Sequence, residues 1–305
     1  MSGALLEIRK KIGGVKNTRT ITKAMQMVAA SKMRQFQKRA ISTRGYVQDL
    51  LAILAKNLTT QESTIYTEKR NHGATLFVLY TSDKGLCGPL NNKIINALFR
   101  SKKWLETPLD QRKLLTIGKK SYDYAKTNKI PVLKHTGQIP EKLTHLDAIK
   151  VVETILEIWE KEKIKEVIFV APHYKNSFTF YPIIKTFLPF SQKTIESTLG
   201  PLQATQENPE NQNKQLASNH FMIFAPSEEH VLNRLYEQLV QSLFIQAFME
   251  LKASEYSSRM IAMQNATDAA DRITNDLTLA YNKARQAVIT QEIAELLGGA
   301  ASLEE

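Results

Sequence analysis

The last stretch of the chain, Ser227 to Leu297, leaves few choices of fold because it contains neither proline nor glycine. Pro226 and Ser227 precede two glutamates, and these residue types favour the start of a helix. About seventy uninterrupted residues with a rise of about 1.5 Å each would form a helix on the order of 100 Å long. We therefore expect one continuous helix over residues 227–297.

The second half of this stretch carries small and apolar residues at alternating steps of four and three, the heptad spacing of a coiled coil. The predicted seam consists of Ala266, Ala270, Ile273, Leu277, Ala280, Ala284, Ala287, Gln291 and Ala294. Alanine lets a partner helix come close but buries little area, so such a helix needs a long partner. Gln291 would serve to fix the register.

The partner candidate is the N-terminal stretch, residues 1–58, which shows the same rhythm without proline. Its apolar positions are Ile8, Ile12, Val15, Met25, Ala29, Met33, Phe36, Ala40, Val47, Leu50, Leu54 and Leu58. Two long helices at opposite ends of a chain pair most simply antiparallel. The alternative is that both are ordinary core helices of an all-helical domain.

The block between the helices, residues 74–225, alternates short apolar runs with helical patterns. Strands are expected at 75–80, 113–117, 132–133, 167–170 and 178–187, and helices at 90–105, 119–128 and 146–162. Pro182 would break the last strand or place it at an edge. The alternation predicts a small, partly parallel α/β sheet. A polar segment at about 200–218 is interpreted as a flexible insertion.

Composition narrows the class of protein. No run reaches the eighteen or so apolar residues of a membrane span, and the N-terminus lacks the apolar core of a secretory signal. A lone Cys87 excludes an intrachain disulfide framework and fits a reducing compartment. The histidines form no cluster with metal-ligand spacing, so no metal site is expected.

The net charge of +11 is unevenly distributed. Residues 1–44 hold eleven lysines and arginines against the single acid Glu7, whereas the stretch from Ser227 onward is acidic. Oppositely charged helices could simply pair, or the basic helix could meet an acidic protein surface or nucleic acid. Nucleic acid is the weaker partner, because no aromatic residues are interleaved with the basic ones and no reader motif is present.

Motifs for catalysis or cofactor binding are absent from the sequence. There is no phosphate loop and no Gly-x-Gly-x-x-Gly fingerprint. The nearest candidate is Gly85-Leu86-Cys87-Gly88, where Pro89 removes one backbone donor. Cys87 is better explained as a buried structural cysteine than as a nucleophile. Two alternatives stay open: a nucleotide-binding α/β protein with coiled-coil extensions, and a basic coiled-coil adaptor.

Three regions resemble the gamma subunit of the bacterial F-type ATP synthase. They are Thr20–Met33 (TITKAMQMVAASKM), the turn Ser82–Gly88 (SDKGLCG) and the C-terminal segments Tyr281–Gln286, Ile289–Glu295 and Gly298–Ala301. The resemblance implies an antiparallel coiled coil of the terminal helices and a central Rossmann-like α/β domain. It also implies a non-catalytic rotor shaft that couples proton transport through the membrane c-ring to ATP synthesis.

The resemblance further implies partners and a location. One copy would stand inside the hexamer of alpha and beta subunits, with its lower part on the epsilon subunit and the c-ring, and with no cofactor or nucleic acid. It would be peripheral to the cytoplasmic face of the bacterial inner membrane. Pro89 and the long polar insertion depart from the family pattern, and the paired regulatory cysteines of the chloroplast form are missing.

Contacts with the hexamer can be assigned to residues that match the family motifs. Lys23 and Met25 would face the acidic lever of the beta subunits, and Arg259 would help from the facing helix. The remaining implied contacts lie near the C-terminus: Arg285, Gln286, Thr290, Glu292 and Glu295. The tip from Leu296 would turn in an apolar collar.

Overall fold

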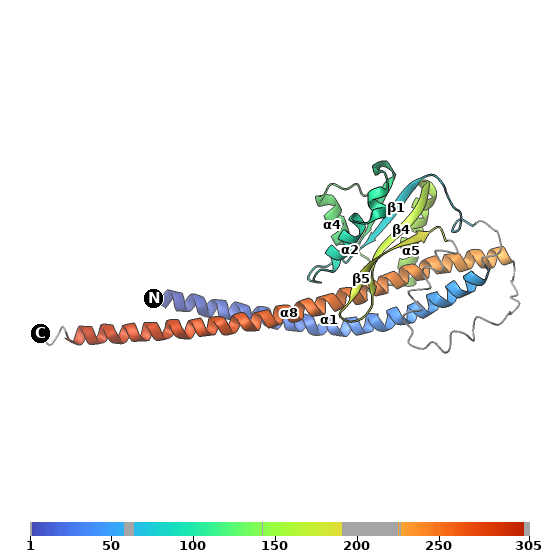
Figure 1. Ribbon diagram of the computed structural model, residues 1–305. Coiled ribbons are helices and arrows are strands. Elements are labelled where there is room, and N and C mark those ends of the chain that lie inside the picture. The colour runs from blue at the N-terminus through green and yellow to red at the C-terminus, as the bar shows by residue number, and fades with distance from the viewer. Residues whose placement is uncertain (1, 58–63, 142, 191–224, 226, 302–305) are drawn as a thin grey trace. The chain divides into compact units, whose positions relative to one another are not determined.

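The computed structural model describes residues 2–57, 64–141, 143–190, 225 and 227–301. Its longest elements are the two terminal helices, α1 (Ser2–Asn57) and α8 (Glu228–Ala301) (Figure 1). Both expected helices are thereby confirmed, and α8 continues beyond its predicted end at Leu297. The predicted insertion at about 200–218 lies outside the described residues.

Packing divides the chain into two compact units. The first unit comprises Met1–Ser31 and Arg259–Glu305, and the second comprises Lys32–Ser258. Each terminal helix therefore contributes to both units. The domains expected from the sequence, 1–58, 74–225 and 227–297, divide the chain by type of element instead. These domain boundaries stay a prediction.

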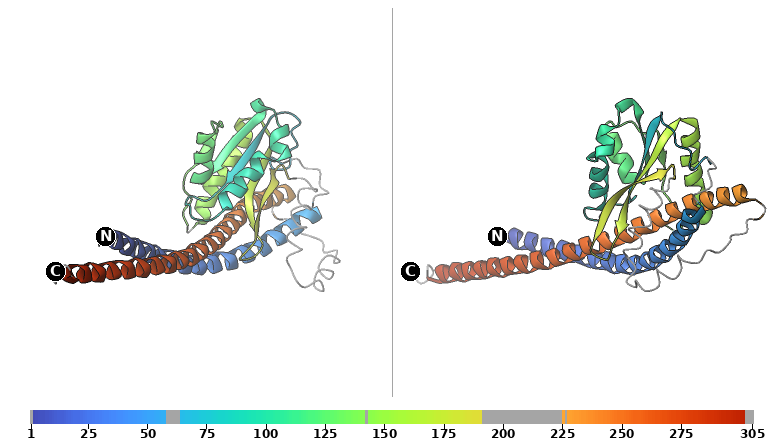
Figure 2. Two further views of the ribbon diagram at one scale, coloured as in Figure 1. Left: turned by 60° about the vertical axis from the view of Figure 1, so that its left-hand side comes forward. Right: turned by 45° about the vertical axis from the view of Figure 1, so that its right-hand side comes forward.

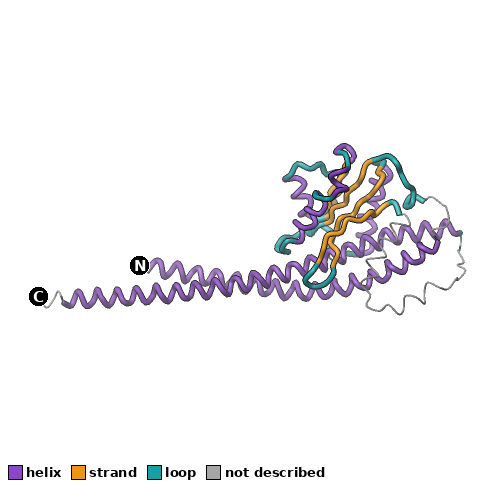
Figure 3. Tube along the Cα trace, in the orientation of Figure 1, coloured by secondary structure: helices purple, strands orange, loops and turns teal. Residues whose placement is uncertain are grey.

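In the first unit α1 and α8 pair antiparallel (Figure 3). Three side-chain pairs join them: Arg19 with Asp271, Thr22 with Thr267 at 2.9 Å, and Gln26 with Gln264. The two residue numbers of each pair add up to 289 or 290 (19 + 271, 22 + 267, 26 + 264), as two antiparallel helices in fixed register require. The antiparallel pairing expected from the sequence is confirmed.

The seam on α8 differs in register from the predicted one. Between residues 262 and 288 the buried positions are Met263, Thr267 and Ala270, and the half-buried ones are Ala262, Gln264, Ala266, Ala269, Asp271, Thr274, Leu277, Tyr281, Ala284 and Val288. Of the predicted seam, Ala266, Ala270, Leu277 and Ala284 are buried or half-buried. Its other members are exposed, so their assignment to the seam was wrong: Ile273, Ala280, Ala287, Gln291 and Ala294. Alanines occur all round this helix, so spacing alone did not separate the two registers.

The second unit contains a five-stranded sheet in the order β3-β2-β1-β4-β5. Its strands are β1 (Ala74–Tyr80), β2 (Arg112–Ile117), β3 (Lys134–Thr136), β4 (Ile164–Tyr174) and β5 (Phe180–Leu188). All neighbours are parallel except β4 and β5. Strand β5 is an edge strand, which accommodates Pro182. The predicted third strand at 132–133 was placed two residues too early.

Helices lie on both faces of the sheet (Figure 2). They are α2 (Leu90–Phe99), α3 (Lys102–Glu106), α4 (Lys119–Thr127) and α5 (His145–Lys161), with a 3₁₀ turn at Leu109–Gln111. The crossovers from β1 to β2 and from β2 to β3 run in one direction across the sheet, and the one from β3 to β4 runs in the other. With right-handed connections, α2 and α4 therefore lie on one face and α5 on the other. The single helix expected over 90–105 was wrong, because Ser101 ends α2 and caps α3, its Oγ accepting a hydrogen bond from Trp104 N.

The core of the second unit extends from the sheet into both terminal helices. Phe77 packs edge-on against Trp104 on one face, and on the other Tyr80 stacks on Phe244 of α8 with ring centroids 6.0 Å apart. Val47 and Leu51 of α1 are fully buried in the same core. The parts of α1 and α8 that belong to this unit are therefore core helices.

Candidate functional site

The predicted contact residues all belong to the first unit, but their exposure differs. Lys23 and Met25 on α1 are half-buried along the helix pair. Arg259, at the start of the α8 part of this unit, is only 7% exposed. Arg285, Gln286, Thr290, Glu292 and Glu295 are all exposed on α8.

The end of α8 extends beyond the start of α1. By the register of the crossing pairs, Ser2 is level with Val288 (290 − 2). Val288 is also the last half-buried residue, and residues 289–297 are all exposed. Arg285 and Gln286 therefore lie where the helix pair ends, and Thr290 and those after it lie on a single helix. We call residues 285–297 the α8 tip.

Among the described residues, the polar side chains of the α8 tip either bond within the tip or make no bond at all. The hydroxyl of Thr290 donates to the Gln286 carbonyl at 2.9 Å, and Gln291 Nε2 donates to Glu295 Oε1 at 2.8 Å. The side chains of Arg285, Gln286 and Glu292 make no hydrogen bond or ion pair to any described residue. They are available to an external partner.

Charge in the first unit is only partly neutralised by pairing between the helices. Arg19 and Asp271 form an ion pair across the two helices, and Lys11 pairs with Glu7 within α1 at 2.8 Å. Lys10, Lys16 and Lys23 have no ion pair among the described residues. Pairing of oppositely charged helices thus accounts for a small part of the basic charge, and the rest can act on an acidic neighbour.

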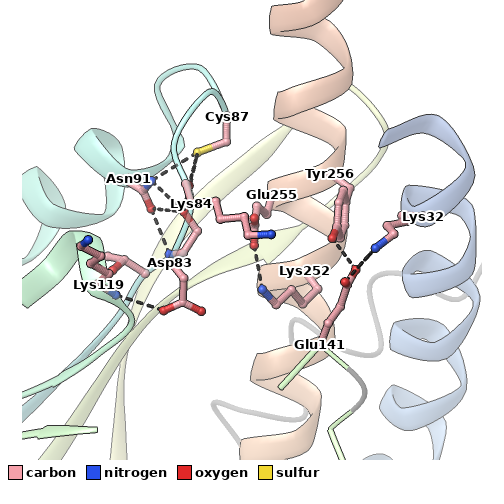
Figure 4. Close-up of polar contacts among 12 residues, drawn as sticks. Lys32, Asp83, Lys84, Cys87, Asn91, Lys119, Glu141, Lys252, Glu255 and Tyr256 are labelled. Atoms are coloured by element: carbon pink, nitrogen blue, oxygen red, sulfur yellow. Dashed lines mark hydrogen bonds and ion pairs between the residues drawn. The ribbon is translucent and has the colours of Figure 1, made fainter. Parts of the chain in front are cut away.

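The turn after β1 carries the Gly85–Gly88 segment that was the weak candidate for a phosphate site (Figure 4). Asn91 holds the turn together: its Oδ1 accepts from Ser82 N at 3.1 Å, and its Nδ2 donates to Cys87 Sγ at 3.2 Å. Asp83 accepts from the backbone of Lys119 at 3.1 Å. Cys87 is buried, as expected for a structural cysteine.

Helix α8 occupies the edge of the sheet where doubly wound folds bind nucleotides. The strand order reverses between β1 and β4, so ligands of such sheets bind at the carboxyl ends of these two strands. There Ser258 Oγ donates to the Cys87 carbonyl at 2.5 Å, and Glu250 contacts the end of β4 through His173 at 2.7 Å. The space at the carboxyl ends of β1 and β4 is thus occupied by the chain's own helix α8. The nucleotide-binding alternative therefore loses its geometric basis.

Sequence reasoning missed the buried polar groups. Thr22 and Thr267 form a hydrogen bond inside the seam, and Arg44, His173 and Glu250 form a buried cluster in the second unit. A signal was present for some of them: Thr22 lies seven residues after Val15, and Arg44 lies four after Ala40. Both positions continue the apolar rhythm with a polar residue.

Within the described ranges, no three His, Cys, Asp or Glu side chains are grouped so as to hold a metal ion. No described helix has a stretch that is both long and apolar enough to cross a bilayer. The arrangement offers contact surfaces instead: a basic helix pair and an exposed α8 tip.

Comparison with known proteins gives consistent matches. A family model described as ATP synthase matches residues 4–303. The chain is 34% identical to the ATP synthase gamma chain of Stenotrophomonas maltophilia and 36% identical to that of Burkholderia ambifaria, over 97% of this chain and 98% of each relative.

Solved structures also match. A chain from the central stalk and c-ring structure of the Tetrahymena thermophila mitochondrial ATP synthase is 26% identical, with a TM-score of 0.55 over 81% of this chain and 99% of that one. A chain of the Euglena gracilis mitochondrial ATP synthase aligns with a TM-score of 0.67 over 99% of this chain and 95% of that one. At 19% identity the second match supports the fold alone.

Proposed function

We propose that this chain, which belongs to the family of ATP synthase gamma chains, transmits torque between the c-ring and the catalytic hexamer through the two units described above. A gamma chain is the non-catalytic central stalk, or rotor, of the proton-translocating F-type ATP synthase. The family and role implied by the sequence resemblance are therefore correct. The particular contacts and their residues are the subject of the proposal.

The α8 tip is the part that enters the hexamer of alpha and beta subunits. The observation that carries this assignment is the exposure of every residue from 289 to 297, on a helix that has left its partner. Unpaired donors at Arg285 and Gln286 suit a loop of the beta subunit that offers acceptors, and Thr290, Glu292 and Glu295 extend the same contact. The apolar residues Leu296 and Leu297, both largely exposed, suit an apolar collar.

The paired part of the first unit meets the acidic lever of the beta subunits. Lys23 supplies charge and Met25 an adaptable apolar contact, both half-buried on α1. Unpaired Lys10 and Lys16 add to a positive field that attracts an acidic surface without fixing one geometry. Arg259, only 7% exposed on the facing helix, would support this contact.

The second unit meets the membrane-side partners. One copy of the chain would join the epsilon subunit and the c-ring through this unit, since the first unit is assigned to the hexamer. The complex would then be peripheral to the cytoplasmic face of the bacterial inner membrane.

The test is reconstitution of the full chain with alpha and beta subunits from the same source. We expect one copy per stable hexamer and Mg-ATP hydrolysis that the chain lacks alone. Arg285→Ala and Gln286→Ala should assemble but turn over ATP more slowly, by roughly tenfold each if a hydrogen bond to a charged group is lost. Arg272→Ala removes another exposed cation of α8 and should leave turnover unchanged.

Two results would count against the proposal. If the chain stayed free of the hexamer and hydrolysis were unchanged, the assignment of partners would be wrong. If the complex formed but Arg285→Ala behaved like Arg272→Ala, the α8 tip would contact the hexamer through other residues. Neutralising Lys10, Lys16 and Lys23 together tests the electrostatic part, which fails if coupled ATP synthesis is untouched.

A further inference from the structure

Three elements of the second unit meet at one buried carboxylate, that of Glu250 on α8. Glu250 Oε1 accepts a hydrogen bond from Arg44 Nη2 of α1 at 3.0 Å, and its Oε2 lies 2.7 Å from His173 Nδ1 of β4. The three side chains are only 4%, 8% and 7% exposed, in the order Glu250, Arg44, His173. We call these three residues the Glu250 network.

Backbone groups complete the Glu250 network. Tyr174 N donates to Glu250 Oε2 at 3.3 Å, and the Tyr174 carbonyl accepts from Arg44 Nη2 at 3.1 Å. Gln246 Nε2, one turn earlier on α8, donates to Glu250 Oε1 at 3.0 Å. The carboxylate and the guanidinium thus both bind the end of β4, and each binds the other.

Burying the charged groups of the Glu250 network costs solvation free energy, and interactions within the network have to outweigh that cost. Burial raises the pKa of Glu250, but the hydrogen bond and charge of His173 and the charge of Arg44 outweigh it, so that the pKa lies below its ordinary value. Lys185 on β5 is a further cation facing the carboxylate, and burial lowers its pKa. Well-packed apolar residues are often as stabilising as a buried ion pair, or more so. Stability alone therefore does not explain why charges occupy this position.

Directional bonds do what apolar contacts cannot. Ring contacts also join α8 to the sheet, such as Tyr80 of β1 stacked on Phe244 and Phe169 of β4 edge-on to the same ring. Apolar contact is non-directional, so it resists separation more than small sliding. Charge-assisted hydrogen bonds from two elements to one carboxylate fix its position and its orientation.

We propose that Glu250 is a positioning residue that holds α1 and α8 in register with strand β4, so that twist applied to the sheet passes to both helices. This inference rests on the proposed rotor function. In that function the sheet receives torque from the membrane side, and the two helices carry it into the first unit. The sheet contacts both helices within the second unit, and there the Glu250 network joins the two helices to one strand.

The experiment measures coupling in the assembled synthase in inverted membrane vesicles, as the ratio of ATP-driven proton pumping to ATP hydrolysis. Glu250→Gln keeps the shape and removes the charge, and we expect the ratio to fall by about twofold or more while hydrolysis continues. Glu250→Asp keeps the charge and should recover most of the ratio. His173→Gln should fall between wild type and Glu250→Gln.

Glu141→Gln is the matched control. Glu141 also joins α1 and α8, through Lys32 at 2.5 Å and the Tyr256 hydroxyl (Figure 4), but it lies in a loop and is 41% exposed. Exposed ion pairs contribute little, so its ratio should match wild type.

An unchanged ratio in Glu250→Gln would overturn the inference. So would equal losses in Glu250→Gln and Glu250→Asp, since that pattern reports packing and not charge. If Glu250→Gln does not assemble, His173→Gln carries the test, and a wild-type ratio in that variant would overturn the inference. Failure of the wild-type chain to join the hexamer would instead overturn the proposed rotor function.

Discussion

The same two helices are packed in different ways in the two units. In the second unit α8 presents Phe244 and Phe248, both fully buried, to an aromatic core. In the first unit the seam of α8 consists mainly of small or hydroxyl-bearing residues such as Thr267 and Ala270. Large aromatic side chains bury far more apolar area than alanine or threonine. One helix pair is therefore anchored to a sheet at one end and only lightly joined at the other.

This difference suits a rotor. A part that receives torque must not slip against its attachment, whereas a part that turns past three similar faces must not bind any of them tightly. The predictions below test the difference through the free energy of unfolding, from the largest expected change to the smallest. Both tryptophans, Trp104 and Trp159, lie in the second unit, so tryptophan fluorescence reports that unit and circular dichroism reports both.

Phe244→Ala should give the largest loss. It removes a fully buried ring that contacts Tyr80 and Phe169, and phenylalanine-to-alanine changes in cores cost about 3–5 kcal/mol. Urea unfolding of the full chain, followed by both tryptophan fluorescence and circular dichroism, measures the loss in either unit. Leu279→Ala in the first unit is the control, because Leu279 is 69% exposed and should change stability by less than about 0.5 kcal/mol. Equal losses in the two variants would contradict the difference between the units.

Glu250→Gln should give a smaller loss that depends on pH. Hydrogen bonds to a charged group contribute about 1.5–3 kcal/mol. Because the folded-state pKa of Glu250 is lowered, its contribution is fully present above the ordinary value of 4.5 and is lost as the pH falls through the folded-state pKa. Arg44, His173 and Lys185 face it from α1, β4 and β5, and all favour the ionised form.

Stability measured against pH for wild type and Glu250→Gln checks this. The two curves should lie apart at neutral pH and converge below about pH 4.5 as the wild-type carboxylate takes up its proton. Glu141→Gln is again the comparison, since that carboxylate is substantially exposed. A constant separation of the wild-type and Glu250→Gln curves down to acid pH would show that shape, and not charge, is lost.

Most of the helices and strands of both units could be predicted from local features of the sequence. Helix α1, helix α8 and the alternating α/β block followed from the absence of proline and from apolar periodicity, because these signals are local. Pro182 predicted either a break in the last strand or an edge position, and β5 is an edge strand. The break between α2 and α3 was missed, since Ser101 is an unremarkable residue until its hydroxyl is seen to cap Trp104 N.

Contacts between distant parts of the chain could not be predicted in the same way. Arg44, His173 and Glu250 are far apart in the sequence, and only the fold brings them together. The seam register failed for a different reason: alanine is nearly as common off the seam as on it, so Ile273 and Thr274 could not be ranked by spacing. The contact residues of the α8 tip were predicted from the family resemblance alone. Their exposure follows from the register of the helix pair, which brings Ser2 level with Val288.

Thr22→Val and Thr267→Val probe the lightly joined seam. Their buried hydroxyls lie 2.9 Å apart, and each also lies within hydrogen-bond distance of a carbonyl of its own helix, that of Arg19 or of Met263. Replacing one removes the shared contact but leaves the other hydroxyl bonded, so it should cost about 1 kcal/mol. Replacing both removes the buried polar pair, and the double variant should be close to wild type. Thermal unfolding followed by circular dichroism gives the double-mutant cycle. Additive losses would mean that the two hydroxyls do not interact.

Arg285→Ala should change stability least, although it lies in the part of the chain with the strongest functional assignment. Arg285 is exposed and makes no hydrogen bond or ion pair among the described residues, so its removal should alter the free energy of unfolding by less than about 0.5 kcal/mol. Slower ATP turnover in the assembled complex would then be a contact effect, because the free chain is unchanged. Urea unfolding of the free chain and turnover of the complex must be measured on the same preparation. If Arg285→Ala destabilised the free chain as much as Phe244→Ala does, the α8 tip would be packed within the chain. Its role as an external contact would then have to be abandoned.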